Sequence, residues 1–352
     1  MRIVFLLLFF LLSSVTHAES LSGLKESAAG FESVVPGRLF EFPADHMPHP
    51  EFRTEWWYVT ANLEDKSGAK WGVQWTLFRQ ATDSQSGFKD WQDGQIWMAH
   101  AAISTPEGHF FSERFARGGI SQAGVEQQKG RWQAWHDDWI WQSNGDQMFP
   151  ASLTFKLAGF EVELNLESSG PRVLQGQSGF SLKSEQGQAS YYYSQPFISI
   201  SGRVSGEGKP VILKGQGWLD REWSSQALAD NQQGWDWFSL HLNDGQKLMV
   251  YRLRDSLGDN RSGSWISAKG HKQHLSPGDI DLEIMRWGEV KTGIDKKANL
   301  PLDWQIKLPS IGKKFQVAPV YDQQWMETSV PYWEGMVNVN DSNGKQIGVG
   351  YM

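Results

Sequence analysis

Strict alternation of apolar and polar residues over short stretches is the feature that most constrains the fold of this chain. The segments 161–167 and 304–308 each place an apolar side chain at every second position, which is the period of a half-buried β-strand. Turn sequences such as Asn144-Gly145 separate these stretches at short intervals. Helical periodicity is confined to 23–29 and 224–231, where we expect short helices. The sequence therefore predicts an all-β protein built of sandwiches or barrels.

A partial internal repeat indicates that the chain contains two copies of one unit. Three segments match three later segments in the same order: 56–65 with 235–244, 150–157 with 301–308, and 193–197 with 332–336. Ordered matches favour an internal duplication over chance similarity between strands. Each copy has the length and strand content of an antiparallel barrel of lipocalin type, which can hold one small ligand. We therefore predict a tandem pair of lipocalin-like antiparallel β-barrels.

The boundary between the two copies is expected at the Gly- and Lys-containing stretch 206–210. The last strand of the first copy is placed at 198–204. The predicted domains are a first barrel at 36–205, a linker at 206–214 and a second barrel at 215–352. The chain length of 352 residues agrees with two domains, since a domain has roughly 100–200 residues.

Residues 1–18 have the pattern of a cleaved secretory signal peptide. A single basic residue, Arg2, is followed by an apolar run at 3–12 and by small residues up to Ala18. This run is too short for a membrane-spanning helix, which needs about 20 apolar residues. Residues 19–35 are expected to form a leader segment. We therefore predict a periplasmic or secreted protein that does not span a membrane once it is processed.

The composition excludes several classes of function. Lys and Arg number 33 against 40 Asp and Glu, so a nucleic acid is not an expected partner. The chain has no Cys, which excludes disulfides, thiolate metal sites and Cys nucleophiles. Dinucleotide, P-loop and serine-hydrolase motifs do not occur, and we expect no cofactor. The 19 Trp residues instead favour a binding site with large flat apolar faces.

A loop with closely spaced imidazoles and a carboxylate precedes the first repeated segment. His46, His49 and Glu51 could converge on a metal ion. Their spacing matches no zinc signature, and the alternative is that they hydrogen-bond a long loop onto the sheet. We favour the second interpretation and expect no metal.

Asp236 is the first candidate for a catalytic acid. Alternation places its side chain on the same strand face as Phe238 and Leu240. Desolvation there would raise its pKa and keep it protonated near neutral pH, as a general acid requires. The alternative is an ion pair with Arg221 or Arg252 inside the barrel, which would lower the pKa instead, and we favour this ion pair.

The strands that contain Trp56 and Trp235 carry aromatic residues on both faces. We infer that their outer faces meet where the two barrels pack. A cleft there would be lined by Trp and Tyr and would suit a long apolar or isoprenoid chain. The alternative to a place in this cleft is, for any single Trp, that its side chain packs in a hydrophobic core.

Several long runs of sequence resemble the AttH-like family, also described as lipocalin-like, predicted secreted hydrolase or carotenoid 1,2-hydratase-related. The resemblance extends from about residue 36 to the end, and it rests on the runs 45–60, 218–226, 234–240 and 332–335. It implies a pair of lipocalin-like barrels, often encoded beside an ABC transporter of the lipoprotein-release type.

The related carotenoid hydratases add water across an isolated C=C bond, which requires a strong desolvated acid and shielding of a carbocation by aromatic faces. By this resemblance Asp236 would be the acid, with Trp223 and Tyr332 near the cation. The hydratases carry an Asp-His-x-Trp stretch where this chain has Asp220-Arg221-Glu222-Trp223. Arg221 cannot exchange a proton there, so the departure argues against hydratase activity.

The sequence therefore leaves three hypotheses open. The first is an exported protein that binds a lipid or isoprenoid-like ligand in an aromatic cavity and serves an envelope ABC transporter. The second is an enzyme of hydratase or hydrolase type acting on such a ligand, and the third is a scaffold that binds a protein partner. The candidate catalytic residues are Asp236, Asp220 and Glu222. The candidate ligand-binding residues are Trp56, Trp57, Tyr58, His100, Tyr192, Arg221, Trp223, Trp235, Trp237, Tyr332, Trp333 and Glu334.

Overall fold

A computed structural model describes residues 28–84, 93–206, 208–226 and 231–352. The predicted signal peptide and most of the predicted helix at 23–29 lie outside these residues. Where a second helix was expected, Ser224 instead ends a strand, and residues 227–230 lie outside the described part of the chain. Only three short 3-10 helices occur in the described part: η2 (Ala44–His46), η3 (Pro277–Asp279) and η4 (Pro309–Ile311). None of the helices described is long and apolar enough to cross a membrane.

The first sheet has 13 strands and is antiparallel, in the order β4-β3-β2-β1-β13-β12-β9-β8-β7-β6-β5, with β10 and β11 paired to β12. Its strands are β1 (Thr54–Glu64), β2 (Lys70–Ala81), β3 (Gln95–Thr105), β4 (Gly108–Arg117), β5 (Ala123–Gln128), β6 (Arg131–His136), β7 (Trp139–Ser143), β8 (Ala151–Leu157), β9 (Phe160–Ser168), β10 (Val173–Leu174), β11 (Phe180–Leu182), β12 (Ala189–Ser205) and β13 (Val211–Ser224).

The second sheet has nine strands in the order β17-β16-β15-β14-β24-β23-β20-β19-β18, and β21 and β22 form a separate pair. These strands are β14 (Gln232–Leu242), β15 (Lys247–Asp255), β16 (Asn260–Ile266), β17 (Lys272–Leu275), β18 (Asp281–Gly293), β19 (Lys296–Leu308), β20 (Lys313–Pro319), β21 (Trp325–Met326), β22 (Tyr332–Trp333), β23 (Met336–Asn340) and β24 (Gln346–Tyr351). The all-β prediction is confirmed.

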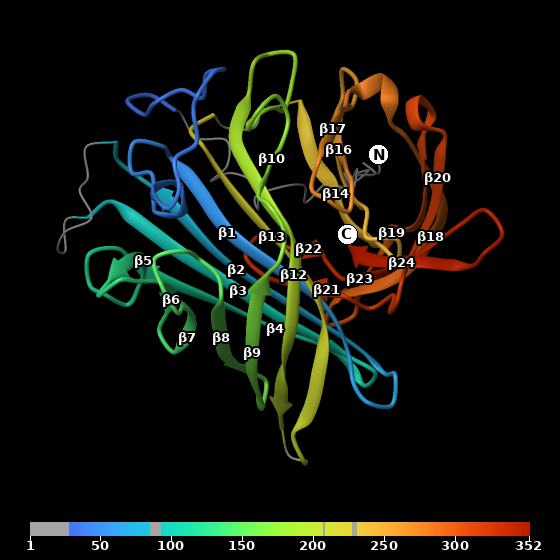
Figure 1. Ribbon diagram of the computed structural model, residues 1–352, viewed down its shortest axis with the longest axis horizontal. Coiled ribbons are helices and arrows are strands. Elements are labelled where there is room, and N and C mark those ends of the chain that lie inside the picture. Colours follow the sequence, from blue (N-terminus) through green and yellow to red (C-terminus); the bar gives the residue numbers. More distant parts are fainter. Residues whose placement is uncertain (1–27, 85–92, 207, 227–230) are drawn as a thin grey trace, which may run out of the picture.

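Each sheet curves around its own hydrophobic core. In β1 the residues Trp57, Val59, Ala61 and Leu63 point into the first core, while the residues between them point outward, as the period of two predicts. The second core is built in the same way from strands along the whole second sheet. Figure 1 shows this sheet, in orange and red, curving almost into a closed barrel.

The two sheets share one strand order. The series β4-β3-β2-β1-β13-β12-β9-β8-β7 corresponds position by position to β17-β16-β15-β14-β24-β23-β20-β19-β18. The matched sequence segments lie in or beside equivalent strands: β1 with β14, β8 with β19, and β12 with β22 and β23. This is the arrangement that an internal duplication would produce, and the duplication itself stays a prediction.

The predicted boundary between the barrels needs a correction. Strand β13 pairs with β1 from Lys214 to Ser224 and also with β12, so it belongs to the first sheet. The stretch 206–210, predicted as part of a linker, connects β12 to β13 within that sheet. The close approach of β13 to β1 requires a glycine at 215, because a Cβ atom there would lie 2.0 Å from the carbonyl oxygen of Asn62 on β1. A Gly-rich hairpin and an interdomain linker have the same composition, which is why sequence alone placed the boundary too early.

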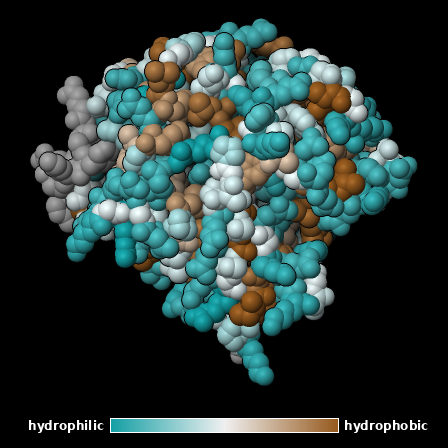
Figure 2. Space-filling model, in the orientation of Figure 1, coloured by the Kyte–Doolittle hydropathy of each residue, from teal (hydrophilic) through white to brown (hydrophobic). Residues whose placement is uncertain are grey.

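The outer faces of the two barrels pack against each other through a third apolar cluster. It includes Tyr192 and Trp218 from the first barrel and Met249 and Tyr251 from the second. Aromatic contacts add to it, with ring centroids 5.4 Å apart for Tyr58 and Trp237. Figure 2 shows hydrophobic side chains scattered over the visible face between hydrophilic ones. Aromatic side chains on the outer faces of β1 and β14 thus meet between the barrels, as the sequence predicted, whereas many of the Trp side chains lie in the first core.

Candidate active site

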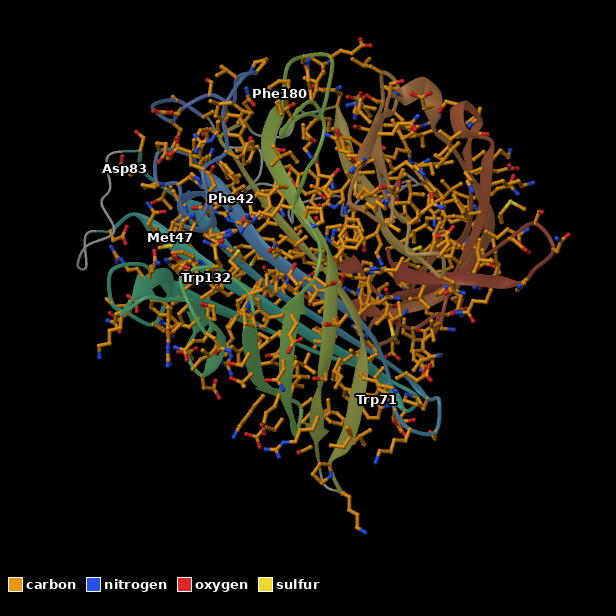
Figure 3. The ribbon with its side chains drawn as sticks, viewed as in Figure 1. Phe42, Met47, Trp71, Asp83, Trp132 and Phe180 are labelled. Atoms are coloured by element: carbon orange, nitrogen blue, oxygen red, sulfur yellow. The ribbon has the colours of Figure 1, made fainter. Side chains whose placement is uncertain are left out.

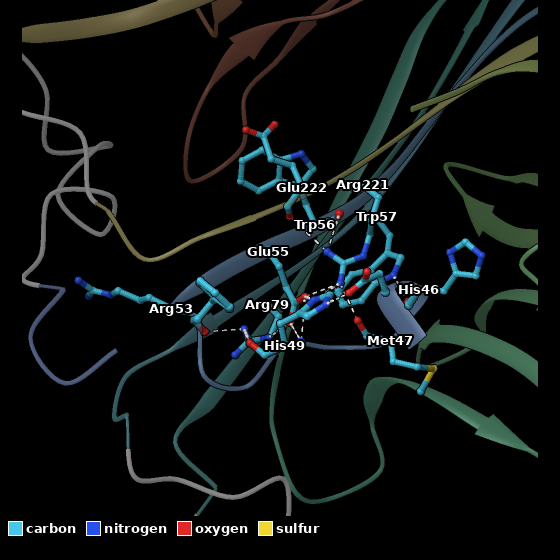
Figure 4. Close-up of polar contacts among 12 residues, drawn as sticks. His46, Met47, His49, Arg53, Glu55, Trp56, Trp57, Arg79, Arg221 and Glu222 are labelled. Atoms are coloured by element: carbon cyan, nitrogen blue, oxygen red, sulfur yellow. Dashed lines mark hydrogen bonds and ion pairs between the residues drawn. The ribbon is translucent and has the colours of Figure 1, made fainter. Parts of the chain in front are cut away.

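A buried ion-pair network fixes the loop that enters β1 (Figure 4). The Glu55 carboxylate, fully buried, accepts hydrogen bonds from Arg79 and Arg221 and a bond of 2.9 Å from the His49 backbone N–H. Burial alone would raise the pKa of Glu55, but the two guanidinium groups hold it well below its usual range. The network has the character of a structural clamp, because two buried arginines and a backbone N–H hold one buried carboxylate in place.

Arg221, Trp57 and Trp223 belong to this clamp. The guanidinium carbon of Arg221 lies 3.8 Å from the centre of the Trp57 ring. The His49 ring stacks on Trp223 at 3.9 Å. Trp57 also donates a hydrogen bond of 3.0 Å to the carbonyl of His46. Alternation along β1 and β13 turns these three side chains toward the core, and their place at a ligand site stays a prediction.

The candidate metal ligands do not converge. His46 forms a hydrogen bond of 2.6 Å with the hydroxyl of Tyr193, whereas His49 lies between Asp45 and Glu55. No group of three or more potential ligands occurs among the residues described. These histidines instead hold the loop on the barrel, beside Met47 and Trp132 at one end of the first sheet (Figure 3).

Asp236 is engaged by two arginines. Its carboxylate accepts a hydrogen bond of 2.8 Å from Arg252 Nε and another from Arg254. Arg252 lies directly opposite Asp236 in the β14–β15 register. The ion-pair alternative therefore describes this residue, and a desolvated acid does not. The neighbouring Trp235 is 50% exposed, and Trp333 donates its indole N–H to the carbonyl of Asp322.

A second group of polar residues gathers on the outer face of the first barrel, where β1, β13 and β12 lie side by side. Tyr58 on β1 is paired in register with Asp220 on β13, which is paired in turn with Ser194 on β12. The next row pairs Glu222 with Tyr192. The outward-facing residues of these three strands form one side of what we call the interface cluster, and residues of β14 and of the segment at β22 form the other. The interface cluster consists of Tyr58, Tyr192, Asp220, Glu222, Trp237, Tyr332 and Glu334.

Asp220 is a buried carboxyl group without an ion pair among the described residues. It accepts hydrogen bonds from Ser194 and, at 2.7 Å, from the indole N–H of Trp218. Burial raises the pKa of Asp220 to about 7, although these hydrogen bonds oppose the shift. A substantial fraction of Asp220 is therefore protonated at neutral pH.

Glu334 has the same character and comes from the opposite side of the interface. It follows β22, is 8% exposed, and accepts a hydrogen bond of 2.6 Å from Tyr58. Burial raises the pKa of Glu334 to about 8, with the Tyr58 hydrogen bond opposing the shift. The interface cluster thus holds two carboxylic acids that can carry protons at neutral pH.

Glu222 differs from these two acids because it is paired with a cation. Lys183 lies 2.7 Å from its carboxylate, and Ser190 donates a second hydrogen bond. Lys183 also sits 4.5 Å from the ring centre of Tyr251. Lys183 could not be found from the sequence, because it lies in the turn between β11 and β12 and carries no motif. Ser194 could have been found from the alternation along β12.

The rim of the interface cluster is aromatic. Tyr58, Trp237 and Tyr332 are half-buried, whereas Asp220 lies beneath them with an exposure of 3%. His100 reaches the cluster by a contact of 2.8 Å with the hydroxyl of Tyr332. Trp56 lies on the same outer face of β1, and its ring is 6.5 Å from that of Phe78.

A pocket of about 460 Å³ lies elsewhere, at the end of the first barrel. Its walls include His46, Gln147, Phe149, Arg172 and Gln195. This lining is mostly polar and contains none of the interface cluster. The pocket is therefore not the Trp- and Tyr-lined cavity that the sequence predicted.

Comparison with known proteins gives the family and the fold. The model of the family described as AttH-like matches residues 33–352. The crystal structure of an AttH protein from Nitrosomonas europaea is 31% identical, with a TM-score of 0.79, over 91% of this chain and 98% of that chain. No curated protein matches the sequence.

Two more distant structures share the fold. Kievitone hydratase from Nectria haematococca superposes with a TM-score of 0.65 at 14% identity, over 92% of this chain and 95% of that one. CghA with Sch210972 superposes with a TM-score of 0.54 at 11% identity, over 93% and 96%. Since the family model covers nearly the whole chain and the Nitrosomonas structure is similar along its length, the protein belongs to the AttH-like family.

Proposed function

We propose that this protein is an enzyme of hydratase type, in which a buried carboxylic acid protonates a carbon–carbon double bond of an apolar substrate. The observation that carries the proposal is the pair of acids at the barrel interface, Asp220 and Glu334. Burial raises their pKa values to about 7 and about 8. General acids work best when their pKa is close to the operating pH.

The surroundings of these acids fit the chemistry of that step. Protonation of an alkene gives a carbocation, which the negative faces of aromatic rings stabilise. Tyr58, Tyr192 and Trp237 supply such faces, and their hydroxyl and indole groups are already hydrogen-bonded within the cluster. The substrate would approach from the half-exposed rim and lie against these rings. The fold shared with kievitone hydratase supports the proposal at the level of architecture alone.

The departure at Arg221 does not weaken this proposal. Arg221 stands where the related hydratases carry a histidine, but its side chain points into the clamp around Glu55. Asp220 lies on the opposite face of β13, and Glu334 lies on the segment that follows β22.

The test is hydration of a panel of prenylated phenols and acyclic isoprenoids in ¹⁸O-labelled water, followed by mass spectrometry. We expect labelled alcohol from the wild type and at least about 100-fold less from Asp220→Asn or Glu334→Gln, since a general acid contributes roughly 10²–10⁴-fold. Glu289→Gln is the matched control, because Glu289 is exposed and pairs with the exposed Lys297. Unchanged turnover in both acid variants would overturn the assignment.

A lipid- or isoprenoid-binding role without turnover is the second candidate, and it uses the same aromatic rim. In that case ligand binding would survive both acid substitutions and no product would form. We further propose that residues 1–18 are removed on export and that the protein works in the periplasm or outside the cell, beside an envelope ABC transporter. Amino-terminal sequencing of the mature protein and co-purification with the transporter test these two proposals.

A further inference from the structure

Three side chains from three strands form a hydrogen-bonded series that ends at the interface cluster. Nε2 of His100 lies 2.9 Å from Oε1 of Glu113, and Nδ1 of His100 lies 2.8 Å from the hydroxyl of Tyr332. His100 and Glu113 are directly opposite in the β3–β4 register. Tyr332 belongs to β22, so the series crosses from the first sheet to a segment of the second half of the chain.

The series has a defined direction because Glu113 can only accept hydrogen bonds when ionised. Burial raises the pKa of Glu113, but hydrogen bonds from His100 and Ser329 outweigh this and lower it. The Ser329 backbone N–H and hydroxyl lie 3.0 Å and 2.6 Å from the Glu113 carboxylate. A carboxylate at this position assigns the ring proton to Nε2 of His100. Nδ1 is then left as the acceptor of the Tyr332 hydroxyl proton.

Packing holds the imidazole in this orientation. His100 is 1% exposed, its ring stacks on Tyr332 with centroids 5.6 Å apart, and Phe78 meets its other side edge-on at 5.3 Å. Glu113 retains 19% of its side-chain surface, so the outer end of the series reaches solvent. A base that is oriented by an acid and hydrogen-bonded to a hydroxyl is the arrangement by which a hydroxyl group is activated.

The proposed hydration needs such a base, because an attacking water must lose a proton as its oxygen bonds to the cationic carbon. We infer that His100 and Glu113 form the basic arm of the interface cluster and act through Tyr332. The water proton passes to the Tyr332 oxygen while the phenolic proton passes to Nδ1 of His100, and Glu113 stabilises the imidazolium. The carbon receives its proton from Asp220 or Glu334, and solvent restores both ends. This assignment rests on the proposed hydratase function.

A test that needs no natural substrate measures how strongly the Tyr332 hydroxyl is activated. p-Nitrophenyl acetate is the probe: its acetyl group transfers to the Tyr332 oxygen, the phenolic proton passes to His100, and p-nitrophenolate leaves. Peptide mass spectrometry locates the acetyl group, and the release of p-nitrophenolate gives the rate. We expect acetylation of Tyr332 in the wild type, with a maximal rate about 100-fold lower in His100→Gln. The half-saturating probe concentration should be unchanged, which a merely structural loss would not produce.

Two further variants show whether slower acetylation comes from loss of the base or from a change in folding. Glu113→Gln keeps the shape of the side chain but removes the charge that assigns the tautomer, so it should also slow acetylation if His100→Gln fails to fold. His109→Gln is the matched control, since His109 lies on the same strand as Glu113 and its ring is hydrogen-bonded to the hydroxyl of Ser104. Equal Tyr332 acetylation in wild type, His100→Gln and Glu113→Gln, or none in the wild type, would overturn the inference. The acetylation does not require Asp220 or Glu334, so a wild type that is acetylated but hydrates no alkene would count against the proposed function alone.

Discussion

The hydroxyl of Tyr58 donates a hydrogen bond of 2.6 Å to Oε1 of Glu334 across the interface between the barrels. Tyr58 comes from the first strand of the first sheet, whereas Glu334 lies between β22 and β23 near the end of the chain. The contact brings a carboxylic acid from one half of the chain beside the row of Tyr58 and Asp220 in the other. The candidate active site therefore exists only in the packed pair of barrels.

Replacing Asp220 with Asn should change how stability depends on pH. The pKa of Asp220 is about 7 in the folded protein and 3.8 as the unperturbed value, so the folded state holds this proton more tightly. As the pH rises from about 4 to about 7, ionisation of Asp220 therefore lowers the free energy of unfolding of the wild type. The difference in Tm, variant minus wild type, should increase between about pH 4 and about pH 7 and level off at higher pH. Differential scanning calorimetry measures it, and a difference independent of pH would contradict the assignment.

Replacing Glu55 with Gln should destabilise the first barrel strongly. Arg79 and Arg221 are both fully buried and pair with this carboxylate. Removing one partner of a buried ion pair leaves uncompensated charge and costs about 3–5 kcal/mol. Urea denaturation gives the free energy of unfolding. The control is Glu163→Gln, whose exposed pair with Arg203 should be worth less than about 1 kcal/mol.

Asp236→Asn should act on stability and not on catalysis. Asp236 is held by Arg252 and Arg254 on the second barrel, away from the proposed acids. We expect a lower Tm with turnover of the active substrate retained within about threefold, because a general acid would contribute at least about 100-fold. A loss of hydration comparable to that of Asp220→Asn would restore Asp236 as the catalytic acid.

Gly215→Ala tests the position of β13 in the first sheet. A Cβ atom at Gly215 would lie 2.0 Å from the carbonyl oxygen of Asn62, so the strands must separate to admit it. We expect a destabilisation of about 1–3 kcal/mol, as for overpacking in a core, measured by urea denaturation. Gly145→Ala is the control, because nothing lies within 4 Å of its added Cβ atom. Equal stability of the two variants would argue for the boundary predicted at 206–214.

The alternation of apolar and polar residues was sufficient to predict the all-β fold and the meeting of aromatic faces. Tyr58, Asp220 and Glu334 lie in the runs that carry the family resemblance, and the structure brings them together. The same alternation, applied to β13, would have separated Asp220 from Arg221, because neighbouring residues on a strand face opposite ways.

The partners of the charged residues could not be predicted from the sequence. Asp236 was placed on the correct strand face, with Phe238 and Leu240 in the second core. Its carboxylate is paired with Arg252 and Arg254, which the β14–β15 register brings alongside it. Glu113 carried no motif at all, and its link to His100 follows from pairing between β3 and β4. Strand register is a property of the folded sheet, so the partners of these charged residues could not be assigned from the sequence.

Infrared titration of Asp220 and Glu334 shows whether these buried carboxyl groups are protonated at neutral pH, and it requires no substrate. The wild type should show the C=O stretch of protonated carboxyl groups at neutral pH, and this signal should disappear with apparent pKa values near 7 and 8. Asp220→Asn should remove one component and Glu334→Gln the other, while Glu289→Gln should remove neither. If both carboxyl groups are already ionised at about pH 6, as ordinary Asp and Glu side chains are, the interface cluster holds no acid and the account is wrong.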